Sequence, residues 1–282
     1  MVLLAYMGAL LAAWGSLTLV GDLHPLAQGL VADVVATLVI FAVSFAVNNS
    51  SVYDPYWSVV PPVLVGWWMM TPEALAGNAD RQWLVLALVG LWGARLTWNW
   101  TRGWAGLSHE DWRYVDLANK HGRRYWLVSF SGIHMFPTLL VFGGSAALWP
   151  ALTSTAPLGW GDALAAAVTL IGIGCEALAD QQLRAFRLQR PPRGAILKTG
   201  IWAWSRHPNY FGEMTFWWGL FVFAAFTAPG SWWAIVGALS INLLFVFVSL
   251  PMIEERHAAR REGWRAHAEK TPRVLLWPPR AG

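Results

Sequence analysis

Long apolar runs are the feature that most constrains this chain. Hydrophobic residues make up 56% of its 282 residues and charged residues only 13%, whereas about 25% of the residues of an ordinary soluble domain are charged. A membrane-spanning helix needs about 20 mostly apolar residues. The runs that approach this length are Val2–Val20, Leu30–Val47, Ser58–Met70, Trp83–Trp100, Trp126–Trp149, Ala163–Ala179, Phe211–Phe226 and Ser231–Leu250. The sequence therefore predicts an all-α polytopic membrane bundle with seven or eight transmembrane helices, in a single integral domain over residues 1–282.

The count stays open because the third run is short and contains Pro61 and Pro62. Two prolines inside an apolar run predict a kinked or re-entrant segment, since proline removes a backbone donor and clashes with the preceding turn. The 21 tryptophans agree with a membrane protein, because tryptophan is enriched at membrane–water interfaces.

Basic residues orient the predicted bundle. They concentrate in residues 102–124, in residues 184–206 and in the C-terminal tail, whereas the loops between these segments contain only Arg81 as a strong base. Positively charged loops remain in the cytoplasm, so we expect the cofactor side to face the cytoplasm, in a bacterial inner membrane. This arrangement accounts for the net charge of +4 without nucleic acid as a partner.

The densest group of polar residues stands immediately before the seventh apolar run. Residues 205–213 read Ser-Arg-His-Pro-Asn-Tyr-Phe-Gly-Glu. Ionisable groups at membrane depth are costly and usually mark a functional site. Pro208 disfavours helical geometry at His207, so we expect a shaped turn that opens a helix and binds something polar. Lys198 and Arg206 suit a phosphate group.

A second polar group follows one face of the sixth run. The spacing of Glu176, Asp180, Arg184 and Arg187 places these side chains on one side of a helix. The alternative is a solvent-exposed helix end stabilised by ion pairs. Glu176 favours a binding role, because it lies inside the apolar run, where a carboxylate needs a partner.

The tail after the last run carries Glu254-Glu255-Arg256-His257. A basic interfacial helix that touches lipid headgroups is one reading, and a cofactor contact is the other. Pro251 suggests that the chain turns here and covers the cytoplasmic mouth of the bundle.

A fourth polar group, residues 48–58, links the second and third runs and includes Tyr53, Asp54 and Tyr56. A tight turn at Asp54-Pro55 is the ordinary explanation. Arg95, Asn99 and Arg102 form a polar stripe on the fourth run, and we expect Arg95 to pair with Asp54. A metal site is not expected, because the chain has one cysteine and no pair of histidines at metal-ligand spacing.

These motifs resemble the steroid 5α-reductase superfamily, and more closely the bacterial integral membrane proteins of unknown function that share its 3-oxo-5α-steroid 4-dehydrogenase C-terminal domain. Besides residues 205–213, the resemblance rests on Tyr56-Trp57-Ser58, Glu176-x-x-x-Asp180-Gln181, Phe186-Arg187, Gly200-Ile201-Trp202, Glu254-Glu255 and Trp277-Pro278-Pro279. It implies an NADPH-dependent membrane reductase that transfers hydride to the activated C=C bond of a hydrophobic substrate such as a 3-oxo-4-ene steroid. It also implies contact with membrane lipid, and a division into N-terminal spans (residues 1–47) and a catalytic region (residues 48–282).

The resemblance implies particular site residues. Cofactor contacts carried over by position are Glu176, Asp180, Arg187, Arg206, Asn209, Tyr210 and Glu213, to which the same polar groups add Arg184, Lys198, Trp202, Ser205, His207, Glu255 and Arg256. Asp54 and Arg95 fall on catalytic positions, and Trp92 falls where the family has a catalytic tyrosine. We expect Tyr53 or Tyr56, oriented by Asp54, to supply the acidic donor instead. Substrate contacts are expected from Trp57, Trp92 and Asn99.

Two alternatives remain open from the sequence. Isoprenylcysteine and phospholipid methyltransferases, which use S-adenosylmethionine, have similar Arg-His-Pro segments. A lipid-binding relative without catalysis is the other alternative. Four bases near the motif favour a phosphate-bearing dinucleotide over S-adenosylmethionine; they are Arg184, Arg187, Lys198 and Arg206.

Overall fold

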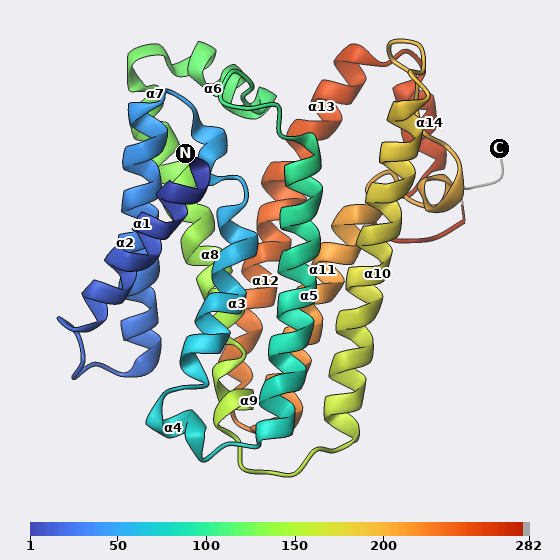
Figure 1. Cartoon of the computed structure of the whole chain (residues 1–282). Coiled ribbons are helices and arrows are strands. Elements are labelled where there is room, and N and C mark those ends of the chain that lie inside the picture. Colours follow the sequence, from blue (N-terminus) through green and yellow to red (C-terminus); the bar gives the residue numbers. More distant parts are fainter. Residues whose placement is uncertain (279–282) are drawn as a thin grey trace. The chain divides into compact units, whose positions relative to one another are not determined.

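The structure, a computed structural model, describes residues 1–278, and these residues form helices joined by turns, with no strand among them (Figure 1). Pro279 of the Trp-Pro-Pro motif lies outside the described residues. Four unbroken helical runs are long and apolar enough to cross a membrane: Pro25–Ala46, Trp112–Thr153, Trp160–Leu188 and Trp232–Arg260. The all-α class is therefore confirmed, and the chain is an integral membrane protein.

The chain divides into two compact units, Met1–Leu158 (unit 1) and Gly159 onward (unit 2). The helices of unit 1 are α1 (Val2–Leu17), α2 (Pro25–Ala46), α3 (Tyr56–Trp68), α4 (Pro72–Leu75), α5 (Ala79–Gly103), α6 (Trp112–His121), α7 (Tyr125–Val128), α8 (Phe136–Ala146) and α9 (Trp149–Thr153). Those of unit 2 are α10 (Trp160–Leu188), α11 (Pro208–Thr227), α12 (Ile235–Leu244), α13 (Leu250–Arg260) and α14 (Trp264–Lys270). Each of the eight apolar runs is largely helical.

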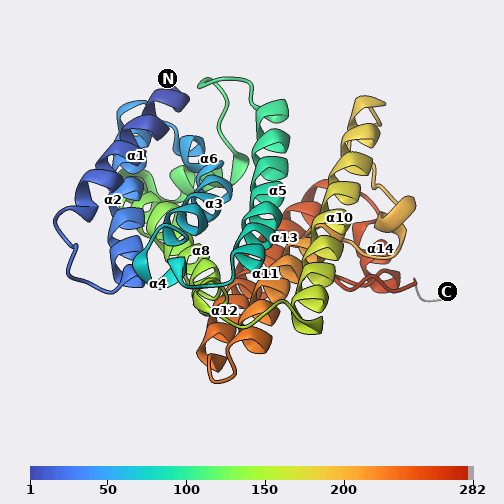
Figure 2. The same cartoon turned by 60° about the horizontal axis from the view of Figure 1, so that its bottom comes forward.

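In unit 1, α2 packs against α1 on one side and against α8 on the other, and α3 packs against α5 and α8 (Figures 1 and 2). Pro61 and Pro62 both lie inside α3, and the helix continues past them to Trp68. Because α3 has only 13 residues, it is shorter than the roughly 20 residues of a full span. The third run is thus a short helix that contains both prolines.

In unit 2, α10 and α11 form the most extensive helix pair. Two glycines allow this close approach: a Cβ atom on Gly172 would lie 2.5 Å from the backbone nitrogen of Phe216, and one on Gly212 would lie 2.6 Å from that of Glu176. Small residues let helix backbones approach closely within membranes. The start of α11 is thereby held against the middle of α10.

The end of the last apolar run differs from the sequence prediction. The helix continues from α12 through a π-helix, Phe245–Ser249, into α13, so the chain does not turn at Pro251. Proline is tolerated there because it occupies the first turn of α13. The turn comes later, at Gly263, whose φ of 74° suits glycine.

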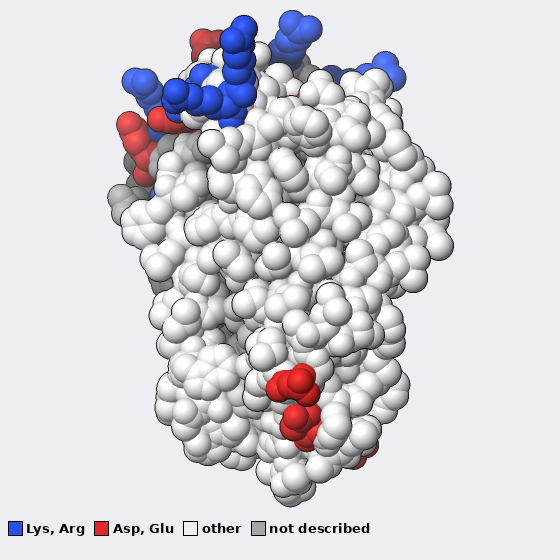
Figure 3. Space-filling view, turned by 90° about the vertical axis from the view of Figure 1, so that its left-hand side faces the viewer, with Lys and Arg blue, Asp and Glu red and all other residues white. Residues whose placement is uncertain are grey.

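Charged side chains are segregated from the apolar surface. Figure 3 shows Lys and Arg gathered at one end of the face in view, with a broad uncharged surface below them. In unit 1, Arg113 and Lys120 lie on α6, and Arg123 and Arg124 lie in the turn that follows it. Such segregation is typical of a protein whose uncharged surface contacts lipid.

Candidate functional site

Glu254 of α13 is the centre of a buried ionic cluster in unit 2. Its carboxylate accepts two hydrogen bonds from Arg206, from Nε at 2.8 Å and from Nη2 at 3.0 Å. His207 Nε2 lies 3.0 Å from the same carboxylate. Only 9% of the Arg206 and 3% of the His207 surface is exposed. A bidentate arginine–carboxylate pair is among the stronger hydrogen-bonded contacts, so this cluster fixes α13 to the start of α11.

The rest of the motif fastens the C-terminal tail. Arg206 Nη1 donates to the carbonyl oxygens of Ala268 and Thr271, and the backbone nitrogen of Arg206 donates to Pro272 at 2.9 Å. The hydroxyl of Ser205, fully buried, donates to the carbonyl of Val274 at 2.7 Å. Each side-chain nitrogen of Arg206 therefore has a protein partner. The structure gives Arg206 a positioning role in the fold of the tail, in place of the phosphate contact that the sequence suggests.

Aromatic rings enclose the other side of His207. Its ring is nearly parallel to that of His257, with centroids 6.2 Å apart and an interplanar angle of 8°. Trp264 of α14 packs edge-on against His257 at 4.4 Å. Burial lowers the pKa of His207 below its ordinary value, although the hydrogen bond with Glu254 opposes the shift. Above its lowered pKa, His207 is a neutral hydrogen-bonding partner of Glu254.

Basic groups from three segments gather beside this cluster. We call them the basic cluster: Arg187 of α10, Lys198 of the following loop, Arg261 after α13, and His267 of α14. The pKa of Arg261 is lowered by burial and by the charge of Arg187. The pKa of His267 is likewise lowered by burial, then by Lys198, Arg206 and Arg261. Arg187 and Lys198 are exposed. The basic cluster thus holds like charges close enough to repel, and an anion would relieve that repulsion.

Two buried carboxylates lie where α10 and α11 meet. Glu176 and Glu213 are each 5% exposed, and Glu213 Oε1 accepts a hydrogen bond of 2.9 Å from Trp217 Nε1. The turn before the motif is also tied to α10. Gln182 accepts from the backbone nitrogen of Ile201 at 3.1 Å, and Trp202 donates to the carbonyl of Ala179 at 3.0 Å.

The remaining predicted cofactor residues all lie in unit 2, on α10, on α13 and at the start of α11. Arg184 and Glu255 are exposed, whereas Asp180, Asn209, Tyr210 and Arg256 are half-buried. Side chains with some exposure can still reach a ligand. The structure therefore separates the anchoring residues, Ser205, Arg206 and His207, from side chains that remain accessible.

In unit 1 the polar turn before α3 is fixed by partners far along the chain. The amide nitrogen of Asn49 donates to the carbonyls of Leu107 and His109, each at 2.9 Å. The backbone nitrogen of Ser50 donates to Glu110 Oε1 at 2.7 Å. The sequence analysis missed these anchors. The paired polar residues Asn48 and Asn49 at the end of an apolar run were the available signal.

Asp54 has a different partner from the one expected. Its carboxylate accepts a 2.6 Å hydrogen bond from the hydroxyl of Tyr114, and its backbone carbonyl accepts one from Trp57. The predicted pair between Asp54 and Arg95 is wrong, because the tyrosine of α6 occupies the carboxylate. Burial raises the pKa of Asp54 to about 6, and the hydrogen bond from Tyr114 limits the rise.

The two candidate tyrosine donors are oriented by residues other than Asp54. Their rings stack at 5.1 Å, and both are 3% exposed. The hydroxyl of Tyr53 is 2.7 Å from the hydroxyl of Thr138, which is 2.8 Å from that of Thr37. The hydroxyl of Tyr56 donates to Asp33 Oδ1 at 2.7 Å. The expected orientation by Asp54 is thus corrected.

Asp33 is a candidate residue that the sequence analysis missed. It is the only carboxylate in the second apolar run, and it is 3% exposed. An acidic residue inside a membrane helix is itself a functional signal, so the sequence contained the information. The predicted substrate residues Trp92 and Asn99 lie on α5 together with Arg95, and Trp92 is fully buried.

Metal ligands do not gather in the part of the chain that the structure describes. Among residues 1–278 no group of three or more His, Cys, Asp or Glu side chains could hold a metal ion.

Comparison with known proteins places the chain in a family. An uncharacterized protein of Schizosaccharomyces pombe is 26% identical over 245 residues, which cover 76% of this chain and 71% of that protein. No solved structure matches. The family model described as "Protein of unknown function (DUF1295)" matches residues 40–271. Because this match covers most of the chain, including both polar turns and the ionic cluster, the protein belongs to the DUF1295 family.

Proposed function

We propose that this protein is an NADPH-dependent membrane reductase that acts on the activated C=C bond of a hydrophobic enone, as its resemblance to steroid 5α-reductases implies. The observation that supports this most directly is the basic cluster of unit 2. Its like charges come from separate segments and lie close together, which is costly unless an anion is present.

A phosphate-bearing dinucleotide fits the residues of unit 2. Arg187 and Lys198 are exposed and carry fixed positive charge, which suits phosphate. Glu176 and Asp180 lie one and two turns earlier on the same helix, where carboxylates can accept hydrogen bonds from ribose hydroxyls or from an amide. The ionic pair of Arg206 and Glu254 would hold α13 and α14 in place around the cofactor.

The tyrosines of unit 1 suit the other half of the chemistry. Bound NADPH supplies hydride, and negative charge then develops on the carbonyl oxygen of the enone. A preorganised hydrogen-bond donor lowers the barrier by stabilising that charge. Tyr53 fits this role better than Tyr56, because Thr138 can donate to Tyr53 and leave the phenolic proton available. The proton of Tyr56 is already directed to Asp33.

The proposal includes the arrangement in the membrane. Besides the four long runs, helices α1, α3, α5 and α11 would complete a bundle of seven or eight spans. The basic segments would lie on the cytoplasmic side of a bacterial inner membrane, where NADPH is available.

The first test is cofactor binding to the full chain in detergent micelles, measured as the shift in unfolding temperature with NADPH, NADH or S-adenosylmethionine. A ligand at about 100 times its Kd stabilises the folded state by about 2.7 kcal/mol. We expect NADPH to stabilise the protein, Arg187→Gln to weaken NADPH binding at least fivefold, and the exposed control Arg123→Gln to leave it unchanged. Stabilisation by S-adenosylmethionine alone would favour a methyltransferase, and no response to any of the three would favour a lipid-binding protein.

The second test is turnover of a 3-oxo-4-ene steroid with NADPH carrying deuterium at the transferred position. We expect deuterium in the reduced product. Removing a donor to a developing oxyanion lowers kcat about 100-fold or more, so Tyr53→Phe should do this while the Kd for NADPH is unchanged. Tyr56→Phe and Asp54→Asn should have smaller effects. Normal turnover in Tyr53→Phe would remove this residue from the mechanism.

A further inference from the structure

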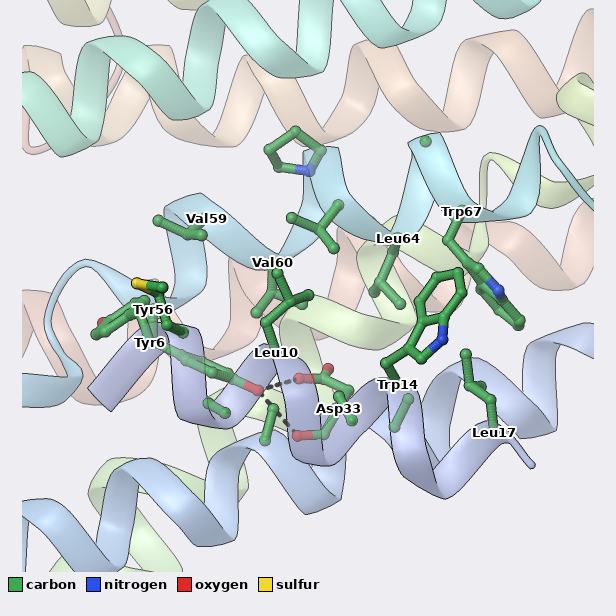
Figure 4. Close-up of a pocket in the computed structure, with 18 of the residues that line it drawn as sticks. Tyr6, Leu10, Trp14, Leu17, Asp33, Tyr56, Val59, Val60, Leu64 and Trp67 are labelled. Atoms are coloured by element: carbon green, nitrogen blue, oxygen red, sulfur yellow. Dashed lines mark hydrogen bonds between the residues drawn. The ribbon is translucent and has the colours of Figure 1, made fainter. Parts of the chain in front are cut away.

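Unit 1 contains an apolar pocket of about 600 Å³ between α1, α2 and α3 (Figure 4). This volume lies within the range of about 300–1,000 Å³ typical of small-molecule sites. Its wall is almost entirely hydrocarbon, with side chains such as Leu10, Val60 and Leu64. Figure 4 shows Tyr56 and Asp33 near one end of the pocket and the indoles of Trp14 and Trp67 towards the other.

The polar groups at the tyrosine end are satisfied, with one exception. The hydroxyl of Tyr6 donates to the carbonyl of Val52 at 3.0 Å. The hydroxyl of Tyr56 is 2.7 Å from Asp33 Oδ1 and 2.9 Å from the backbone oxygen of Asp33. Asp33 Oδ2 is buried and has no hydrogen-bond partner. Among the described residues that line this pocket, it is the buried side-chain oxygen left unsatisfied.

An unsatisfied carboxyl oxygen is expensive in this position. Asp33 lies eight residues into α2, at about 12 Å along the helix axis at 1.5 Å per residue, so water from the membrane surface is distant. Leaving a buried polar group without a partner costs about 1–3 kcal/mol. A ligand hydroxyl would satisfy Oδ2 in either protonation state, because a hydroxyl both donates and accepts hydrogen bonds.

We propose that this pocket binds a hydrophobic alcohol, with its hydroxyl hydrogen-bonded to Asp33 Oδ2 and its hydrocarbon part along α1 and α3 towards Trp14 and Trp67. The distance suits such a ligand, since Tyr6 and Trp14 are eight residues apart on α1, or about 12 Å. In hydrocarbon a lipid hydroxyl has few other partners. The carboxyl group would therefore select alcohols from other apolar molecules of the same shape.

This site is separate from the proposed reductase function. Residues 40–271 match the DUF1295 family, whereas α1 and Asp33 precede that segment. The pocket is therefore built largely from a part of the chain that the family match does not include. Binding of an alcohol also requires no cofactor, so the two proposals can fail independently.

The experiment is equilibrium binding of tritiated 1-dodecanol and tritiated dodecane to the full chain in micelles, without NADPH. We expect the alcohol to bind at least tenfold more tightly than the alkane to the wild-type protein. The double variant Asp33→Leu/Tyr56→Phe removes both hydrogen-bonding partners together, which is less disruptive than removing one. In that variant the ratio of the two affinities should fall to about one, if the hydrogen bond is worth at least the roughly 1.4 kcal/mol that a tenfold ratio represents.

A pair of glycine variants locates the binding. A Cβ atom on Gly66, which lines the pocket, would have no atom within 4 Å, and the same holds for Gly90 of α5, outside the pocket. Gly66→Leu should fill the pocket and abolish binding of both probes, and Gly90→Leu should bind both as the wild type does. Equal affinities of alcohol and alkane for the wild type, or undiminished dodecanol binding to Gly66→Leu, would overturn the proposal.

Discussion

The two units hold their buried ionisable groups in different ways. In unit 2, Glu254 is bound by a fixed positive charge, Arg206, and by His207. In unit 1, each of the two carboxyl groups, Asp33 and Asp54, is bound by the hydroxyl of a tyrosine instead. One cluster depends on charge, and the other on hydrogen bonds that need no formal charge on the donor.

This difference indicates what each unit can bind. Unit 2 has more positive than negative groups around Glu254, since the basic cluster surrounds an ionic pair that is already satisfied. It suits an anion. Unit 1 offers phenol and carboxyl groups in apolar surroundings, which suit an uncharged hydrophobic molecule with one polar end.

The largest expected effect comes from breaking the ionic cluster. Glu254→Gln leaves the guanidinium of Arg206 without its counter-ion in a site where it is 9% exposed. Because Glu254 is itself 21% exposed, we expect a loss of about 2–4 kcal/mol in the free energy of unfolding, at or below the range for a fully buried pair. Denaturant unfolding in micelles measures this. The adjacent exposed residue provides the control, since Glu255→Gln should be almost neutral. Equal effects at the two positions would contradict the importance of this pair.

The next effect concerns the close approach of α10 and α11. In Gly212→Ala the new Cβ atom would lie 2.6 Å from both Gly172 O and Glu176 N. Overpacking of this kind costs about 1–3 kcal/mol, and it should also displace Glu176 and weaken NADPH binding. Gly174→Ala, on the same helix with no atom within 4 Å of the new Cβ, is the matched control. A Gly212→Ala protein as stable as Gly174→Ala would show that the helices separate easily.

Much of the fold follows from local patterns in the sequence. Each apolar run became helical because only internally hydrogen-bonded backbone is stable in lipid. The density of polar groups at residues 205–213 also identified the segment that organises unit 2. The motif was interpreted differently, however, since Arg206 was expected to face a cofactor phosphate and instead contacts Glu254 and the tail.

The partners could not be predicted, because they are distant in the sequence. Glu254 is 48 residues from Arg206, and Tyr114 is 60 residues from Asp54. Spacing rules relate residues one or two helical turns apart, whereas these contacts depend on how helices pack. Asp33 is a different case. A single acid in an apolar run is visible without any structure, but its hydrogen bond to Tyr56 is not.

A pH-dependent effect distinguishes the carboxyl groups of unit 1 from Glu254. The pKa of Asp54 is raised to about 6 in the folded protein, above the value of about 3.9 in an unfolded chain. Its contribution to stability is thus fully present below about pH 4 and is lost as the pH rises through about 6. Asp54→Asn removes this dependence, while the amide oxygen can still accept from Tyr114. Unfolding midpoints from pH 4 to 8 should differ between the two proteins by about 1–2 kcal/mol across this window, and parallel curves would contradict the shift.

The smallest effect tests the neutral hydrogen bonds of unit 1. Tyr6→Phe removes the 3.0 Å hydrogen bond to the carbonyl of Val52 and leaves the ring in place beside Tyr56. A neutral hydrogen bond contributes about 0.5–1.5 kcal/mol, so we expect a loss within this range. The loss should be the same at low and high salt, since no charge is removed, whereas the effect of Glu254→Gln should shrink as salt screens its partly exposed carboxylate. A salt-dependent loss in Tyr6→Phe would show that unit 1 also depends on charge, and the contrast between the units would then fail.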